Sequence, residues 1–85
     1  MKKENETITY EIIDRCKIYE EGVFTAFQVT IKGPDGDTYV GDSWAPEEKY
    51  TYHGMPETVL EEGYRWAKKE AIESMITSLA IKKLL

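Results

Sequence analysis

The chain has 85 residues, of which 41% are hydrophobic, 12% aromatic and 32% charged, and its net charge is -5. This length and composition predict one folded domain and exclude a disordered chain. An acidic chain does not favour nucleic-acid binding, which needs Lys and Arg gathered on one face. No apolar run approaches the roughly 20 residues of a membrane span, and no signal peptide is apparent at the N-terminus. We therefore expect a cytoplasmic protein without a membrane partner.

In chain order, residues 1–6 are polar and are expected to form a flexible tail, followed by a single domain over residues 7–85. Three segments then alternate with period two, which predicts strands over about 7–19, 23–32 and 37–45. The first two are separated by Glu20-Glu21-Gly22 and the last two by Gly33-Pro34-Asp35-Gly36, both of which suit tight turns. The order predicts an antiparallel meander with the second strand at its centre.

The register follows if Tyr19 lies opposite Phe24 and Lys32 lies opposite Asp37, because a slip by one residue would turn every side chain to the other face. This arrangement sets apolar residues against one another in three pairs. The pairs are Ile12 with Ile31, Cys16 with Phe27, and Val29 with Val40.

A long helix is predicted over about 57–83, with Pro56 at its start and Thr58-x-x-Glu61 as a capping box. Its apolar arc should cover one face of the sheet, and the small residues Gly63 and Ala67 at the edge of this arc would allow close approach. Residues 46–55 are expected to form a loop, with a short fourth strand at 49–52 as an open alternative. The predicted fold class is α+β, a three-stranded or four-stranded antiparallel meander with one C-terminal helix packed on it.

The sheet face away from the helix is the predicted functional surface. The assumed register places two pairs of apolar residues on it, which would leave an apolar patch for a partner protein or a second copy. The helix offers a second contact through Trp66, which points away from the core arc. The predicted sheet-face residues are Ile13, Tyr19, Phe24 and Tyr39.

Catalysis is not predicted. The only cysteine, Cys16, and the only histidine, His53, are expected in the sheet and in the loop, and a buried thiol and a surface imidazole account for them. Asp14 and Asp42 should both face the helix and could act as an acid and base pair, but an ion pair with Lys68 or a bulge that turns Asp14 outward explains them equally. No zinc-binding pair or phosphate loop occurs, so we expect no metal and no cofactor.

The sequence predicts a non-enzymatic protein-interaction module, with two other functions as alternatives. An acidic decoy of a phage or mobile element could occupy a basic site of a host protein, and single-stranded nucleic acid could stack on the sheet aromatics beside Arg15 and Lys17. Because carboxylates repel phosphate groups, the acidic residues around the loop and the helix start favour the acidic decoy over nucleic-acid binding. These acids are Glu47, Glu48, Glu57, Glu61 and Glu62.

The predicted order of three strands and a helix is similar in topology to the C-terminal half of a double-stranded-RNA-binding domain. That resemblance implies a lysine pair at the start of the final helix, where the family contacts phosphates. Here Glu57 and Glu61 occupy the helix start, whereas Lys68 and Lys69 lie in its middle. The sequence therefore does not predict binding to double-stranded RNA.

Overall fold

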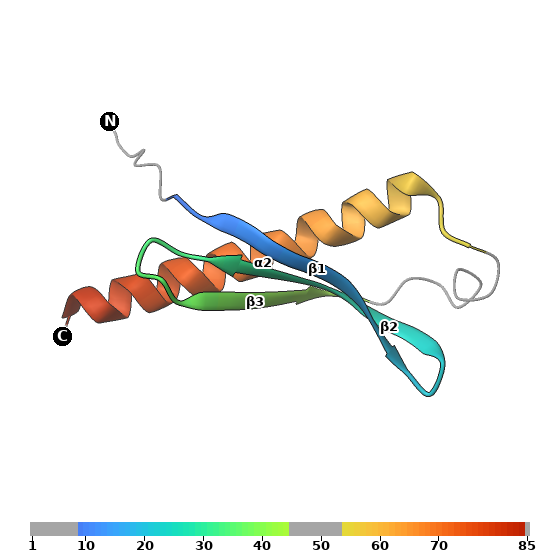
Figure 1. Cartoon of the computed structure of the whole chain (residues 1–85), viewed down its shortest axis with the longest axis horizontal. Coiled ribbons are helices and arrows are strands. Elements are labelled where there is room, and N and C mark those ends of the chain that lie inside the picture. The colour runs from blue at the N-terminus through green and yellow to red at the C-terminus, as the bar shows by residue number, and fades with distance from the viewer. Residues whose placement is uncertain (1–8, 45–53, 85) are drawn as a thin grey trace.

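The structure is a computed structural model that describes residues 9–44 and 54–84. Three strands, β1 (Glu11–Glu20), β2 (Val23–Lys32) and β3 (Thr38–Ser43), form one antiparallel sheet in the order β1-β2-β3. The helix α2 (Glu57–Leu84) crosses one face of this sheet (Figure 1). The predicted α+β meander with a C-terminal helix is confirmed. The expected tail over residues 1–6 and the alternative strand at 49–52 lie outside the described residues.

The helix begins where the sequence predicts. The carbonyl oxygen of Pro56 accepts hydrogen bonds from the amides of Val59 and Leu60, both at 3.1 Å, and so closes the first turn. Gly63, Ala67, Ala71 and Met75 are buried at spacings of four residues, which is the repeat of one helix face. At about 1.5 Å per residue, the 28 residues of α2 span about 42 Å and run along most of the molecule, whose longest extent is 47 Å.

The turn between β1 and β2 has the predicted register. Glu21 and Gly22 both have positive φ, 53° and 81°, which is the combination of a type I′ turn whose twist matches that of a hairpin. Glu20 pairs with Val23 and Tyr19 pairs with Phe24, as predicted. Farther from the turn, two β-bulges change the pairing.

The two bulges lie at opposite ends of the β1–β2 pair. Between Tyr19–Phe24 and Ile18–Ala26, β2 contributes the extra residue Thr25, whose hydroxyl donates a hydrogen bond to the carbonyl of Ile18 at 3.2 Å. Near the other end, β1 contributes the extra residue Ile13 between the pairs of Ile12 and Asp14. The register between the bulges is therefore shifted by one, and Cys16 pairs with Gln28 instead of the predicted Phe27.

The turn between β2 and β3 is one residue longer than predicted. The amide of Gly36 bonds to the carbonyl of Gly33 at 3.0 Å, and the amide of Gly33 bonds to the carbonyl of Asp37 at 2.9 Å. Gly36 has a φ of 88°, so Asp37 belongs to the loop, and Lys32 pairs with Thr38. The predicted pairs of Lys32 with Asp37 and of Val29 with Val40 are wrong. Because the slip is one residue, β3 turns its other face to the helix.

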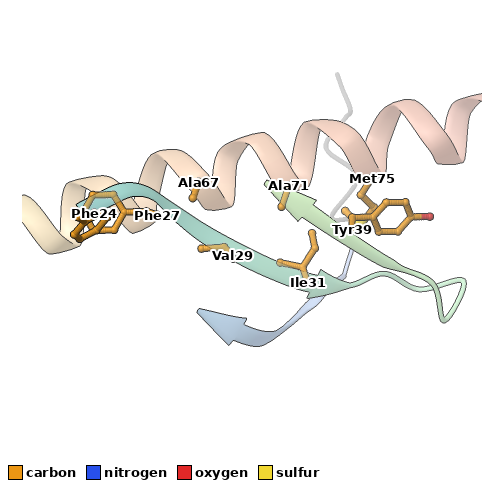
Figure 2. Packing of buried hydrophobic residues seen from close by; sticks show 8 residues of the cluster. All are labelled: Phe24, Phe27, Val29, Ile31, Tyr39, Ala67, Ala71 and Met75. Atoms are coloured by element: carbon orange, nitrogen blue, oxygen red, sulfur yellow. The ribbon is translucent and has the colours of Figure 1, made fainter. Parts of the chain in front are cut away.

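The core lies between α2 and the central and third strands. α2 packs mainly on β3 and β2, whereas β1 pairs with β2 at the edge of the sheet (Figure 1). Figure 2 shows that the core side chains follow the helix axis, with the two phenylalanines toward the start of α2 and Tyr39 and Met75 toward its end. The buried cluster comprises Phe24, Phe27, Val29, Ile31, Tyr39, Ala67, Ala71 and Met75.

Candidate functional site: two exposed surfaces on either flank of the helix

The aromatic patch predicted on the open sheet face does not form. Phe24 is 3% exposed and Tyr39 is 8% exposed, and both belong to the core under α2. The bulge at Thr25 turns Phe24 to the side of Phe27, with ring centroids 4.9 Å apart, and the longer turn before β3 turns Tyr39 toward the helix. Their placement on an open face was wrong for these two reasons.

The other two predicted sheet residues are exposed but separate. Tyr19 lies against Phe24 at the β1–β2 turn, with ring centroids 5.3 Å apart. Ile13 is the extra residue of the β1 bulge, toward the other end of the strand. The structure therefore does not bring the predicted sheet-face set together, and the stacking platform expected for single-stranded nucleic acid is absent with it.

The face of the sheet opposite the helix carries mainly polar side chains in its two middle rows. The pairing and alternation place Asp14, Thr30 and Val40 in one row and Cys16, Gln28 and Asp42 in the next. Gln28 links the second row, because its amide donates to Asp42 Oδ1 at 3.1 Å and its carbonyl oxygen accepts from the Cys16 thiol at 3.6 Å. Asp14 and Asp42 thus face away from the helix, contrary to the prediction, and the bulge at Ile13 is the outward turn that was the alternative for Asp14.

Trp66 is exposed as predicted and has an aromatic neighbour that the sequence did not indicate. Its ring centroid lies 5.9 Å from that of Trp44, which follows β3. Trp66 is 37% exposed and Trp44 is 54% exposed. Lys69 Nζ lies 4.7 Å from the Trp66 ring centroid, and the Trp66 indole N–H donates to Glu62 Oε2 at 3.4 Å. We call Trp44, Trp66, Glu62 and Lys69 the tryptophan patch.

On the opposite flank of α2, a shallow groove separates the helix from β1. It is a hollow of about 240 Å³ lined by Ile12, Arg15, Val29, Glu61, Tyr64, Arg65 and Lys68. The Arg15 guanidinium lies 4.9 Å from the Tyr64 ring centroid, close enough for a cation–π contact, and burial raises the pKa of the Tyr64 hydroxyl. We call this hollow the β1 groove.

Farther along the same flank lies a larger apolar hollow of about 630 Å³. Ile76, Leu79 and Ala80 of α2 form its wall, and the turn residue Asp35 lies at its rim. The Asp35 carboxylate accepts hydrogen bonds from Lys82 and from the Tyr39 hydroxyl, the latter at 2.7 Å, and Lys82 also pairs with Asp37 at 2.6 Å. These bonds hold the pKa of Asp35 well below its usual value and raise that of Lys82, so they attach the end of α2 to the β2–β3 turn.

The described members of the predicted acidic surface are accompanied by cations. Glu57, Glu61 and Glu62 are exposed near the start of α2, but Glu62 lies 3.9 Å from Arg65, and Glu61 lines the β1 groove with Lys68. Glu47, Glu48 and His53 lie outside the described residues. The acidic-decoy hypothesis stays a prediction, and this part of the helix has mixed charge.

Within residues 9–44 and 54–84, no group of three or more His, Cys, Asp or Glu side chains is placed to hold a metal ion. Over the same residues, no helix is long and apolar enough to cross a bilayer. Comparison with protein-family models, with curated proteins and with solved structures finds no match. The fold defines a small α+β domain whose described residues form an open three-stranded sheet and one long helix.

Sequence reasoning missed Trp44 and the β1 groove. Trp44 was assigned to a strand, and nothing in the spacing between it and Trp66 indicates that they meet. The predicted register places Arg15 on the open face, but the two bulges of the β1–β2 pair set it opposite Val29 and beside Tyr64. A bulge has no reliable signal in a single sequence, since it depends on how two strands pair.

Proposed function

We propose that the protein is a non-enzymatic protein-interaction module that forms a homodimer through the tryptophan patch. Trp and Arg dominate the energetic centres of protein interfaces, because large rigid side chains bury much area with little loss of entropy. Trp44 and Trp66 are both exposed and already in contact with each other, so a partner would cover a surface that needs little ordering.

The observation that carries this proposal is the charge pattern around Trp66. Glu62 precedes it by four residues and Lys69 follows it by three, and both flank the indole ring in space. A two-fold axis near Trp66 would bring two helices together in antiparallel orientation, with Glu62 of each copy facing Lys69 of the other. The patch is thus complementary to itself, as an isologous interface requires.

The absence of an enzymatic role is part of the same proposal. Asp14 and Asp42 lie on the two outer strands with β2 between them, and Asp42 is engaged by Gln28. The Cys16 thiol is likewise bonded to the Gln28 side chain. Neither arrangement resembles a nucleophile with an adjacent base. An enzymatic activity of the wild type that Asp14→Asn or Asp42→Asn abolishes would contradict this part of the proposal.

The dimer is tested by sedimentation velocity of Glu62→Lys and Lys69→Glu variants over a wide concentration range. Each single change places like charges opposite each other, so each variant alone should dissociate at least about tenfold more readily than the wild type. An equimolar mixture of the two restores opposite charges across the axis and should form a heterodimer. The double variant Glu62→Lys/Lys69→Glu should again form a homodimer.

Two outcomes contradict the dimer. The first is a wild-type mass that stays that of a monomer at every concentration, which would leave the patch for a foreign protein. The second is a dimer that neither single variant weakens, which would assign self-association to another surface. A Lys83→Glu variant, with the same charge change at the end of α2, serves as the control.

A further inference from the structure

In the part of the chain that the structure describes, β1 is an outer strand and basic side chains lie beside it at the β1 groove. β1 is an outer strand of the described sheet, so no described strand pairs with the backbone N–H and C=O groups along its outer edge. Ile12 and Ile13 are exposed beside this edge. An exposed edge with apolar side chains is the surface on which an extended peptide adds as a further strand.

The helix side of β1 and the groove beside it carry more basic than acidic side chains, with Glu61 the acid among the groove residues, although the chain as a whole is acidic. Arg15 and Lys17 pair with Val29 and Phe27, so both lie on the helix side of β1, where Lys68 also lines the groove. Within the described residues none of these three cations has an ion-pair partner; Arg15 is instead placed over the Tyr64 ring. Three cations on one side of this strand, without an ion-pair partner among the described residues, favour an anionic partner.

A second copy of the chain does not fit this edge. Two antiparallel β1 strands related by a two-fold axis keep their helix sides on the same face. Pairing the centres of the strands would then set Arg15 and Lys17 of one copy beside the same residues of the other, which is repulsive. The edge is therefore suited to a different chain.

A peptide fits this edge better than nucleic acid does. The strand edge offers main-chain hydrogen bonds in the pattern that another strand requires. Glu61 in the groove and Glu11 and Glu20 at the two ends of β1 would repel a run of phosphates. A peptide that alternates carboxylates with apolar side chains can turn all its carboxylates to the helix side, where Arg15 and Lys17 lie.

We propose that β1 and the β1 groove bind an extended acidic segment of a partner protein. The segment adds as a fourth strand beside β1 and places its carboxylates against Arg15, Lys17 and Lys68. This site lies on the flank of α2 opposite the tryptophan patch and does not depend on dimerisation.

The probe is a fluorescein-labelled peptide of about ten residues that alternates Val and Glu, the length of an ordinary long strand. Its binding is measured by fluorescence anisotropy and mapped by amide chemical shifts. We expect saturable binding with the largest shifts along β1, and at least about tenfold weaker binding to an Arg15→Gln/Lys68→Gln variant. A peptide alternating Val and Gln should bind weakly.

The matched control is Lys32→Gln/Lys83→Gln, which removes the same charge from positions outside the groove and should change the affinity less than about twofold. Trp44→Ala should leave the affinity unchanged, which separates this site from the dimer patch. Equal losses in both double variants would reduce the effect to general attraction of opposite charges and overturn the proposal. Tighter binding of an oligothymidine of similar length would also overturn it, in favour of nucleic acid.

Discussion

The backbone of Gly41 in β3 lies directly against the backbone of Ala67 in α2. A Cβ atom added to Gly41 would lie 2.3 Å from the Ala67 carbonyl oxygen and 2.3 Å from the amide nitrogen of Ala71. Both alanines are completely buried, so helix and strand touch without intervening side chains. Since β3 turns this residue toward the helix only through the longer β2–β3 turn, the contact depends on the observed register.

Gly41→Ala should destabilise the protein by about 2 to 3 kcal/mol, because the new methyl group meets helix backbone that cannot rotate away. Urea unfolding followed by circular dichroism measures this change. The neighbouring Val40→Ala removes an exposed side chain and should cost about 1 kcal/mol or less. If the alanine at 41 were as stable as the wild type, the observed register of β3 would be wrong.

Gly63→Ala should also destabilise the protein, by about 1 to 2 kcal/mol. Helix propensity alone would stabilise the alanine variant by roughly 1 kcal/mol. The added Cβ, however, would lie 2.1 Å from Cε2 of Phe27, whose ring is held between Phe24 and Tyr64. The steric term should exceed the propensity term.

A second substitution separates the two terms at position 63. Phe27→Leu removes the ring edge that the new methyl group meets, so Gly63→Ala should cost less in that background than in the wild type. Additive effects in this double-mutant cycle would show that the glycine is not required for the approach of the ring.

Met75→Ala should cost about 2 to 4 kcal/mol, whereas Ile76→Ala should cost about 1 kcal/mol or less. The two residues are adjacent in α2, but Met75 is 1% exposed and fills the core beside Tyr39, whereas Ile76 is 45% exposed. Thermal and urea unfolding of both variants give the comparison. Similar losses for both would indicate that Ile76 is covered in solution, for example by a partner in the apolar hollow.

The stability of the protein should fall in acid partly through Asp35. Its pKa in the folded state lies below the usual value of 3.8, chiefly because Lys82 and Tyr39 donate hydrogen bonds to the ionised carboxylate. The stabilisation is therefore fully present above the unfolded-state pKa and is lost as the pH falls below about 5 toward the folded-state pKa.

Thermal unfolding measured from neutral to acidic pH tests this assignment. Asp35→Asn should lower the melting temperature at neutral pH and flatten its decline in acid, and high salt should reduce the difference because these groups are accessible to solvent. Glu73→Gln, which neutralises an exposed carboxylate of α2, should leave the slope as in the wild type. An unchanged slope in Asp35→Asn would show that the ion pair does not persist in solution.

The elements that local patterns determine could be predicted from the sequence. The period-two segments, the turn at Glu20-Glu21-Gly22 and the long helix each depend on neighbouring residues, and the structure confirms them. Trp66 could be assigned to the outside of the helix for the same reason. The fold class follows from the order of these elements.

Which face each strand presents was decided only by the tertiary structure. One extra residue in the β2–β3 turn and one at each bulge reverse the sides of Tyr39, Phe24 and Arg15. A register shift of one residue changes the local strand propensity little, so packing decides the register. In the observed register Gly41 faces α2 and lets the helix lie close to the sheet. Phe24 then packs against Phe27 under the helix. Both candidate surfaces depend on such long-range contacts, because Trp44 meets Trp66 and Arg15 meets Tyr64 only after strand and helix have packed.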